Sequence, residues 1–456
     1  MTIEYFHKDD PKLKADIESI VTEMRDAKEY GSILNITPVD FAGLYARFDE
    51  IRNDINMMQM SALDELLPLV KCAELLAQKY DVVVTNPPYM AVSNAGAKVN
   101  VYVKKNFPDS KADLFAVFIE RCGQMAKKNG YQAMITQHAW MFLSSFEKLR
   151  TKLLAVDIVN MAHLGARAFE EIGGEVVQTT SFVIRKSHIA DYKGEYCRLI
   201  EPTSQQGKED MFLAGENRYA ADQSNFSKIP GSPVAYWISR TMSEAFSKKL
   251  LRDYGATKQG FATGDNNRFL RYWHEPSSKN TALLLLSPEN ATKSTYKWFP
   301  CNKGGTFRKW YGNNVYVANW EKNGIAMRSF TGAVIRNPQF YFKEGISWSS
   351  LANQLSLRYS PCGFLFESKG SMCYANSNIN LKYLLGLLNS KTTSEALSVL
   401  SPTLDFHEGP MSKVPVIMDD LQKNMVDDIV FTCVDTSRRD WDSYETSWDF
   451  KRNPLV

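Results

Sequence analysis

The chain has 456 residues, enough for two or three domains with substantial cores. Hydrophobic residues make up 44%, charged residues 23% and the formal net charge is +3, which is ordinary for a soluble protein and excludes a disordered or membrane-spanning chain. Seven scattered cysteines without a C-x-x-C pair argue against structural zinc and a disulfide framework, so we expect a cytoplasmic protein without a metal site.

The first 75 residues are predicted to form a helical segment. KLKADIESIVTEMRDA (12–27) and SALDELLPLVKCAELLAQKY (61–80) both carry apolar residues at helical spacing. A strand is predicted next at 81–85, where DVVVT is β-branched and continuous. Such a run is typical of a strand that is buried on both faces of a parallel sheet.

Asn86-Pro87-Pro88-Tyr89 follows this strand directly. The two prolines remove two N–H donors and fix φ, so the segment can neither extend a ladder nor begin a helix. It is predicted to be a stiff loop at the carboxyl end of a strand, where ligands bind in open α/β sheets. A double proline can also simply end a strand.

The next hundred residues alternate between helices and strands. A helix is predicted from Ala112 to Lys128, ended by Asn129-Gly130, and another over 145–155. Strands are predicted at 131–137, 158–164 and 176–186, with a turn at Gly173-Gly174 before the last. The order βαβαβ closed by a hairpin is typical of the second half of a doubly wound, Rossmann-like sheet, so 76–200 is predicted to be part of an α/β domain.

Several motifs in this region occur in a recognisable order. Asn-Pro-Pro-Tyr is followed by D-L-F-x-x-F-I-E-R (113–121), I-T-Q-x-x-W (135–140) and V-Q-T-x-x-F-V-I-R-K (177–186). This series resembles the γ class of N6-adenine DNA methyltransferases, in which a target-recognition domain follows the catalytic domain. Protein-glutamine and rRNA guanine methyltransferases use a similar tetrapeptide, so they remain an alternative.

Longer motifs in the second half narrow the resemblance. They look like the adenine-specific methyltransferases of bacteriophage-exclusion (BREX) systems, the PglX type, and extend the resemblance over roughly residues 70–450. The motifs are IPGSPVAYWIS (229–239), KQGFATGDNNRFLRYW (258–273), KWFPCNKGGTFRKWYGN (297–313), FKEGISWSSL (342–351), LNSKTTSEALSVLSPTLDFHEGPMSKVPV (388–416) and DWDSYETSWDF (440–450).

The resemblance implies a catalytic role for the tetrapeptide. The family rotates the target adenine out of the duplex, at a cost of a few kcal/mol. By that resemblance the Asn86 side-chain oxygen and the Pro87 carbonyl accept the two amino hydrogens, so that the lone pair of the nitrogen is aimed at the methyl group of S-adenosylmethionine. Pro87 and Pro88 keep these acceptors rigid, and Tyr89 stacks on the flipped base.

The chain departs from the family where the cofactor binds. The family holds S-adenosylmethionine with a glycine-rich loop after the first strand, but the only glycines in residues 1–85 are Gly31 and Gly43, neither in that context. The chain therefore looks like a portion of a longer enzyme, with unknown cofactor-binding residues, and we expect weak or no cofactor binding alone. It could be a methyltransferase completed by a missing N-terminal portion, or a DNA-binding module that no longer methylates.

Other candidate residues have structural interpretations. His138 and His163 are expected to be partly buried and hydrogen-bonded rather than catalytic. Asp113 is predicted to cap a helix first, and to line a substrate pocket second. Phe115 and Phe118 are expected to lie in the core.

The middle of the chain is basic. Residues 241–400 contain 20 Lys and Arg against 9 Asp and Glu, a balance of +11, whereas residues 401–456 contain 6 against 11. We therefore predict a mixed α/β target-recognition domain at 201–430 that binds double-stranded DNA, and a short acidic tail at 431–456. The alternative to DNA binding is that these residues form β-turns on a solvated surface, with their aromatic side chains in the core. Two clusters of cations, glycines and aromatics supply the candidate DNA-binding residues, which are Lys258, Asn266, Arg268, Arg271, Lys303, Arg308 and Lys309.

Overall fold

The computed structural model describes residues 2–53, 57–169, 177–283, 287–376, 379–401 and 406–455. The chain forms two compact units. Unit 1 comprises Met1–Ser227 with Gly231–Trp237, and unit 2 comprises Lys228–Pro230 with Ile238–Val456. The four segments expected from the sequence are finer than this division and remain a prediction.

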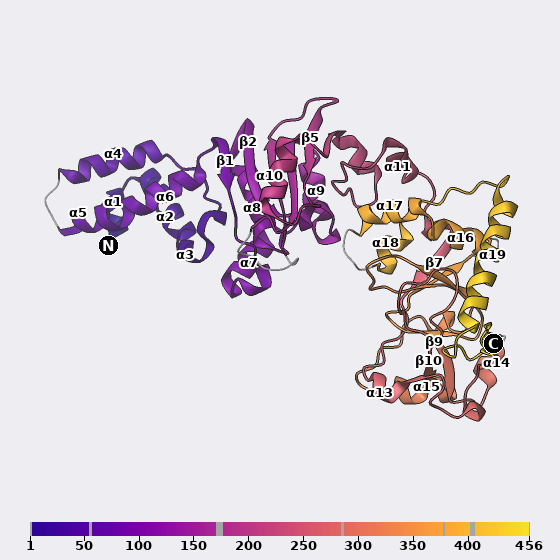
Figure 1. Cartoon of the computed structure of the whole chain (residues 1–456). Coiled ribbons are helices and arrows are strands. Elements are labelled where there is room, and N and C mark those ends of the chain that lie inside the picture. Colours follow the sequence, from indigo (N-terminus) through magenta and orange to yellow (C-terminus); the bar gives the residue numbers. More distant parts are fainter. Residues whose placement is uncertain are drawn as a thin grey trace. The chain divides into compact units, whose positions relative to one another are not determined.

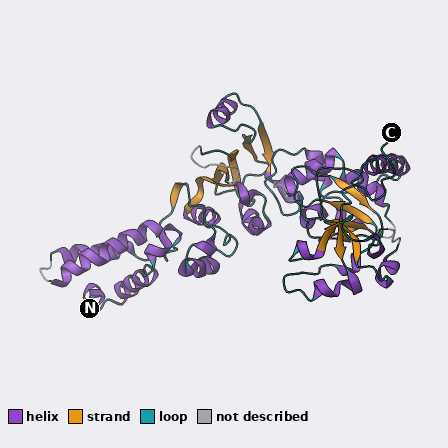
Figure 2. Ribbon diagram, turned by 60° about the horizontal axis from the view of Figure 1, so that its bottom comes forward, coloured by secondary structure: helices purple, strands orange, loops and turns teal. Residues whose placement is uncertain are grey.

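Unit 1 begins with helices, as the spacing of apolar residues predicts (Figure 2). Ile17, Phe48 and Val70 are fully buried where these helices pack together. The Asp10 side chain caps the second helix by accepting from the backbone N–H groups of Lys12 and Leu13. The elements are α1 (Thr2–His7), α2 (Pro11–Glu23), α3 (Ala27–Tyr30), η1 (Gly31–Ile33), α4 (Phe41–Arg52), α5 (Met57–Ser61), the π-helix η2 (Ala62–Leu66) and α6 (Leu67–Ala77).

A six-stranded sheet follows, in the order β1-β2-β4-β3-β5-β6 (Figure 1). Its strands are β1 (Tyr80–Thr85), β2 (Ala126–Gln137), β3 (Asp157–Ala166), β4 (Gln178–Arg185), β5 (Lys193–Arg198) and β6 (Arg218–Asp222). β1 is parallel to β2 and β3 to β5, while β4 lies antiparallel between β2 and β3. The four strands predicted from the sequence are therefore confirmed as members of one sheet. The turn predicted at Gly173-Gly174, with Val176, lies outside the described residues.

Short helices connect these strands. The side of the sheet that carries α8 and α9 contains a large apolar core, in which Phe115, Trp140 and Phe182 are almost completely buried. The elements are η3 (Val92–Asn94), α7 (Ala97–Asn106), α8 (Leu114–Met125), η4 (His138–Met141), η5 (Ser144–Phe146), α9 (Glu147–Leu153), α10 (Gln205–Leu213) and η6 (Gln223–Lys228).

The boundary between α8 and β2 differs from the prediction. The helix ends at Met125, and residues 126–130 belong to the strand instead of the helix. Asn129 has φ +65°, and its N–H donates to the Lys186 carbonyl oxygen. A Cβ on Gly130 would lie 2.8 Å from the Asp81 carbonyl oxygen. Asn129-Gly130 thus forms an irregularity within the sheet, where pairing partners far along the chain outweigh the local stop signal.

The expectation that residues 81–85 are buried on both faces is wrong. β1 is the edge strand of the sheet, and its only ladder neighbour among the described residues is β2. Val82 and Val84 are 55% and 71% exposed, whereas Val83 packs against the core from the other face. An apolar run predicts a strand, but burial depends on which neighbours are present.

Unit 2 is a mixed α/β structure with two four-stranded sheets, ordered β13-β9-β10-β8 and β12-β11-β14-β7. The strands are β7 (Gly255–Lys258), β8 (Leu270–Tyr272), β9 (Trp298–Asn302), β10 (Tyr316–Asn319), β11 (Gly345–Trp348), β12 (Leu357–Ser360), β13 (Leu365–Phe366) and β14 (Met372–Ala375). The predicted α/β class, with a mixed α/β second part, is confirmed.

Helices surround these two sheets. They are α11 (Arg240–Ala245), α12 (Leu251–Tyr254), α13 (Asn266–Phe269), η7 (Ser278–Asn280), α14 (Pro288–Lys293), α15 (Glu321–Arg328), η8 (Pro338–Phe340), α16 (Leu381–Leu388), α17 (Lys391–Leu400), α18 (Glu408–Ser412) and α19 (Lys423–Asp442). The first part of the predicted acidic tail belongs to α19, which packs on α16 through the buried Val430. Among the described residues, no helix combines the length and apolarity needed to cross a membrane.

Candidate functional site

The Asn-Pro-Pro-Tyr loop leaves β1 at its carboxyl end. Thr85 pairs with Met134, so the loop lies beside the carboxyl end of the parallel strand β2. Asn86 is exposed, and its side-chain amide makes no hydrogen bond with any described residue. Pro87 is buried and fixes the backbone beside it. A side-chain amide without a described hydrogen-bond partner is thus held on a stiff loop. The loop lies at the carboxyl ends of the strands, where α/β proteins bind ligands.

Asp113 holds the far end of this loop. Its carboxylate oxygen accepts from the Phe115 backbone N–H at 3.3 Å, which confirms the predicted helix cap. The same oxygen accepts from the Met90 N–H at 3.0 Å, and the Leu114 N–H donates to the Met90 carbonyl. Burial raises the pKa of Asp113, despite these bonds. The cap therefore also ties the loop to α8, a role that sequence spacing did not indicate.

Tyr89 points its ring into the core beside α8. It packs edge-on against Phe115, with ring centroids 6.3 Å apart. Phe115 is buried and Phe118 is partly buried in the same core, as expected. Burial raises the pKa of Tyr89 to about 12, and its buried hydroxyl has no hydrogen-bond partner among the described residues. The buried Tyr89 hydroxyl is therefore a polar group without a described partner, three residues after the exposed Asn86 amide.

The two histidines form a hydrogen-bonded chain near the end of β2. His138 Nδ1 lies 2.9 Å from His163 Nε2, and His163 Nδ1 lies 3.1 Å from the Tyr236 hydroxyl. Burial lowers the pKa of His138 to about 4 and that of His163 well below its usual range. The expectation of buried, hydrogen-bonded histidines is confirmed. Tyr236 was missed, because nothing in the sequence connects positions 73 residues apart.

These histidines make unit 1 sensitive to acid. Both have a lower pKa in the folded state than in the unfolded chain, so the unfolded chain binds more protons below about pH 6.5. We expect their contribution to stability to be lost as the pH falls from about 6.5 towards 4. Thermal unfolding of the full chain should show this decrease, and a His138→Gln/His163→Gln variant should show a shallower one. An equally steep decrease in the variant would assign the effect to carboxylates alone.

Four predicted DNA-binding residues have side chains available at the surface or over aromatic rings. Arg268 is exposed and lies over Phe330, with its guanidinium 5.2 Å from the ring centroid. Asn266 accepts a hydrogen bond from Thr263 at 2.6 Å. The Arg271 guanidinium lies over the Trp298 ring. Lys258, the last residue of β7, lies over the Phe340 ring.

The remaining three lie along residues 303–309. Arg308 forms an ion pair with Asp440 on α19, and the Lys309 ammonium donates to the Asn389 carbonyl at 2.8 Å. Both therefore fasten this segment to neighbouring helices. Lys303 lies 4.6 Å from the Tyr316 ring centroid, at the end of β9. The assignment of all seven residues to DNA remains a prediction, and Arg308 and Lys309 have structural contacts that compete with it.

Positive charge dominates the segment that contains both clusters. Residues 258–343 contain 13 Lys and Arg but only 4 Asp and Glu. Over the part of this segment that the structure describes, Arg308 is the one cation with a carboxylate partner within 4.0 Å. The charges of the other described cations are not neutralised by a carboxylate, which favours an anionic ligand, although Lys309, Arg271 and Arg328 also donate to backbone carbonyls.

The described part of unit 1 does not contain the glycine-rich cofactor loop of the family that the sequence resembles. Gly31 begins the short helix η1 and Gly43 lies inside α4, so neither forms a loop between a strand and a helix. In an open α/β sheet such a loop would follow a strand on the unpaired side of β1. No strand occupies that side among the described residues.

The first part of the chain is similar to a family of restriction-modification methylases. Residues 15–169 match the model of the Eco57I restriction-modification methylase. This match starts well before residue 70, so the N-terminal helices belong to it as well. It contains the Asn-Pro-Pro-Tyr loop and its anchor Asp113.

Two curated relatives have more specific names than the family model. The chain is 43% identical over 408 residues to the adenine-specific methyltransferase PglX of Lacticaseibacillus casei (strain Zhang), covering 86% of this chain and 34% of that protein. It is 38% identical over 437 residues to the adenine-specific methyltransferase BrxX of Escherichia coli O9:H4 (strain HS), covering 94% of this chain and 35% of that protein. The resemblance to PglX-type methyltransferases is confirmed, and the chain spans about a third of the length of these relatives.

A solved structure supports the fold. The restriction-modification enzyme MmeI, in complex with DNA, has a TM-score of 0.50 and 10% identity, and the likeness covers 97% of this chain and 58% of that one. At this identity the likeness concerns the fold.

Proposed function

We propose that the chain carries the catalytic loop and the DNA-recognition part of a site-specific DNA adenine-N6 methyltransferase of a phage-defence system. The observation that carries this proposal is the exposed Asn86 amide, which has no described hydrogen-bond partner and lies on a loop anchored by Asp113. The chain that carries this loop is 43% identical to PglX. The relatives' names supply the reaction class, and the loop geometry supplies the residues.

The loop suits the chemistry of an exocyclic amine. The adenine nitrogen is a poor nucleophile, because its lone pair is delocalised into the ring. Acceptance of its two hydrogens by the Asn86 oxygen and the Pro87 carbonyl would draw the nitrogen towards tetrahedral geometry. The prolines and the Asp113 anchor fix these acceptors before the base arrives, so little reorganisation is needed during the reaction.

S-adenosylmethionine is the methyl donor that this reaction class implies. Since the described residues of unit 1 offer no glycine-rich loop for it, we propose that a separate polypeptide segment completes the cofactor site. The open edge of β1, with the exposed Val82 and Val84, supports this proposal, because an unpaired edge strand is a template for strand addition. This segment is the first partner that we propose, and other phage-defence components are a second. A cytoplasmic location would suit all of them.

Unit 2 is the proposed DNA-recognition part. We expect the full chain to bind duplex DNA with an affinity that falls linearly with salt on logarithmic axes, by about 0.9 per phosphate contacted. Arg268→Ala should make this slope shallower by about one, because its guanidinium is exposed and has no carboxylate partner among the described residues.

Fluorescence anisotropy over a salt series would measure this slope. Arg240→Ala is a matched control, since that exposed arginine is paired with Glu244. A flat salt dependence would contradict phosphate contact by unit 2.

Two alternatives predict different results. A DNA-binding module without catalysis would bind duplex DNA but never methylate it, even with the cofactor segment supplied. A protein-glutamine methyltransferase would have no need of the +9 balance of residues 258–343. An rRNA methyltransferase would bind and methylate RNA, and would not methylate duplex DNA. That charge favours a nucleic acid over a protein substrate, and the identity to relatives named adenine-specific methyltransferases favours adenine as the target base.

A further inference from the structure

Unit 2 contains a column of stacked rings that ends in a cation. The rings of Tyr272 and Tyr316 are stacked, with centroids 5.1 Å apart and an interplanar angle of 22°. The His274 ring stacks on Tyr272 at 5.8 Å and 7°. The Lys303 ammonium lies 4.6 Å from the Tyr316 ring centroid. We call His274, Tyr272, Tyr316 and Lys303 the tyrosine column.

The sheet register produces this column. Tyr316 on β10 pairs directly with Tyr272 on β8 and with Cys301 on β9, so the two tyrosines project from the same side of neighbouring strands. Lys303 follows two residues after Cys301, which returns its side chain to that side. A turn in which the Glu275 N–H donates to the Tyr272 carbonyl brings His274 back over Tyr272. Residues from three separate segments thus meet in one fixed row.

The column reaches solvent and has polar ends. Tyr272 is 48% exposed, His274 is exposed, and Tyr316 is partly buried. Burial and the neighbouring Tyr272 hydroxyl raise the pKa of Tyr316 to about 12. The hydroxyl of the exposed Tyr272 can donate a hydrogen bond outward. Lys303 has no carboxylate partner in the described part of the chain.

We propose that the tyrosine column is a contact for the phosphate backbone of duplex DNA, in which the Tyr272 hydroxyl donates to one phosphate and Lys303 neutralises a neighbouring one. This rests on the proposed function and adds three aromatic residues to Lys303, which was already a candidate from the sequence. Stacking holds the rings in place before DNA arrives, so little side-chain entropy is lost on binding. The surrounding excess of cations favours a polyanion over an acidic side chain of a protein partner.

The test compares the two kinds of contact on the full chain, with a mixed-sequence duplex and a salt series. Tyr272→Phe keeps the stacked ring but removes the hydroxyl, so Kd should rise about 2- to 10-fold with an unchanged salt slope. Lys303→Gln should make the slope shallower by about 0.9. Thermal unfolding of both variants should match the parent chain, because both side chains reach solvent.

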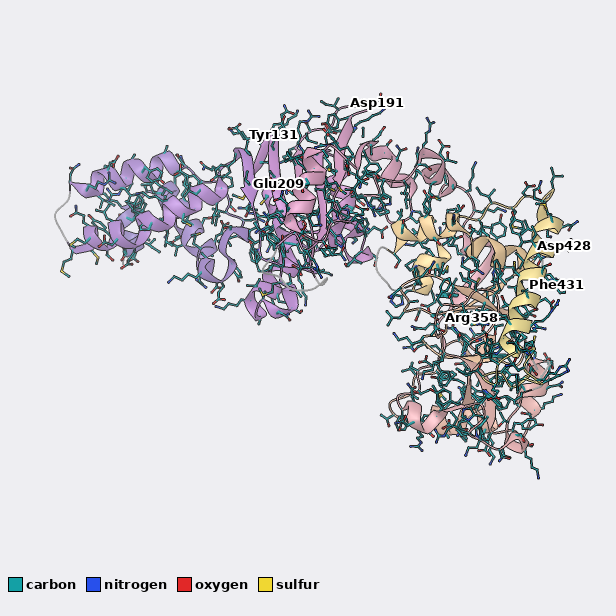
Figure 3. The ribbon with its side chains drawn as sticks, in the orientation of Figure 1. Tyr131, Asp191, Glu209, Arg358, Asp428 and Phe431 are labelled. Carbon is teal, nitrogen blue, oxygen red and sulfur yellow. The ribbon has the colours of Figure 1, made fainter. Side chains whose placement is uncertain are left out.

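Matched controls come from the sheet of unit 1. Tyr131, labelled in Figure 3, is 39% exposed in the middle of β2, and the exposed Lys193 begins β5. Tyr131→Phe and Lys193→Gln should leave affinity and slope unchanged. If the column variants behave like these controls while the parent chain binds DNA, the inference is overturned and the proposed function stands. If the parent chain binds no duplex at any salt, both are overturned.

Discussion

Replacing Asn86 by alanine is expected to lower adenine methylation by at least about 100-fold, with little change in DNA affinity. The substitution removes one of two acceptors for the amino hydrogens, and the backbone of the loop stays fixed by its prolines and by Asp113. Since Asn86 is exposed and makes no hydrogen bond with a described residue, the fold should not suffer. Methyl transfer to duplex DNA is the measurement, with the chain completed by the upstream region of a PglX-type relative.

Asn94→Ala is the control for this experiment. Asn94 is an exposed asparagine on η3, a few residues beyond the loop, and its nearest polar contact is with the adjacent Ser93 at 3.4 Å. Its loss should leave methylation intact. Methylation that survives Asn86→Ala would contradict the role given to this residue. Loss of DNA binding in the same variant would instead show that the loop helps to bind the duplex.

Local sequence patterns predicted the elements around this site well. A β-branched run gave β1, two prolines gave the stiff loop, and an aspartate before an apolar helix gave the cap. Each of these depends on steric or hydrogen-bonding preferences within a few residues. Their resemblance to the PglX-type methyltransferases came from the order of motifs, and the identity to PglX and BrxX confirms that resemblance.

Features that depend on distant partners were not predictable in this way. Asn129-Gly130 looks like a helix stop, but its backbone groups pair with Lys186 and lie against Asp81. Arg308 resembles a phosphate-binding arginine until Asp440, 132 residues away, is seen beside it. The tyrosine column arises only when β8, β9 and β10 are aligned. Spacing along one segment carries no information about such registers.

The second large effect that we expect concerns the binding of S-adenosylmethionine, and it depends on the open edge of β1. We expect calorimetry with S-adenosylmethionine to give no measurable binding to the chain alone, because no described loop offers it a site. Adding the sheet-forming upstream region of a PglX-type relative should restore binding, since new strands can pair with the free edge of β1. Micromolar affinity in the chain alone would reveal a substitute site and contradict this account.

Val84→Asp tests whether β1 is the docking edge. Val84 is 71% exposed in this chain, so the variant should fold with normal stability by itself. In a doubly wound sheet helices cover both faces, so the helices that accompany the added strands would cover this side chain. Burial of a valine contributes about 1.5–3 kcal/mol and an unpaired buried carboxylate costs more, so the association should weaken by at least about 100-fold. Val101→Asp on α7 is the matched control, because Val101 is 68% exposed and lies away from the β1 ladder. Equal association of both variants would mean that the upstream region docks elsewhere, and the open edge would then need another explanation.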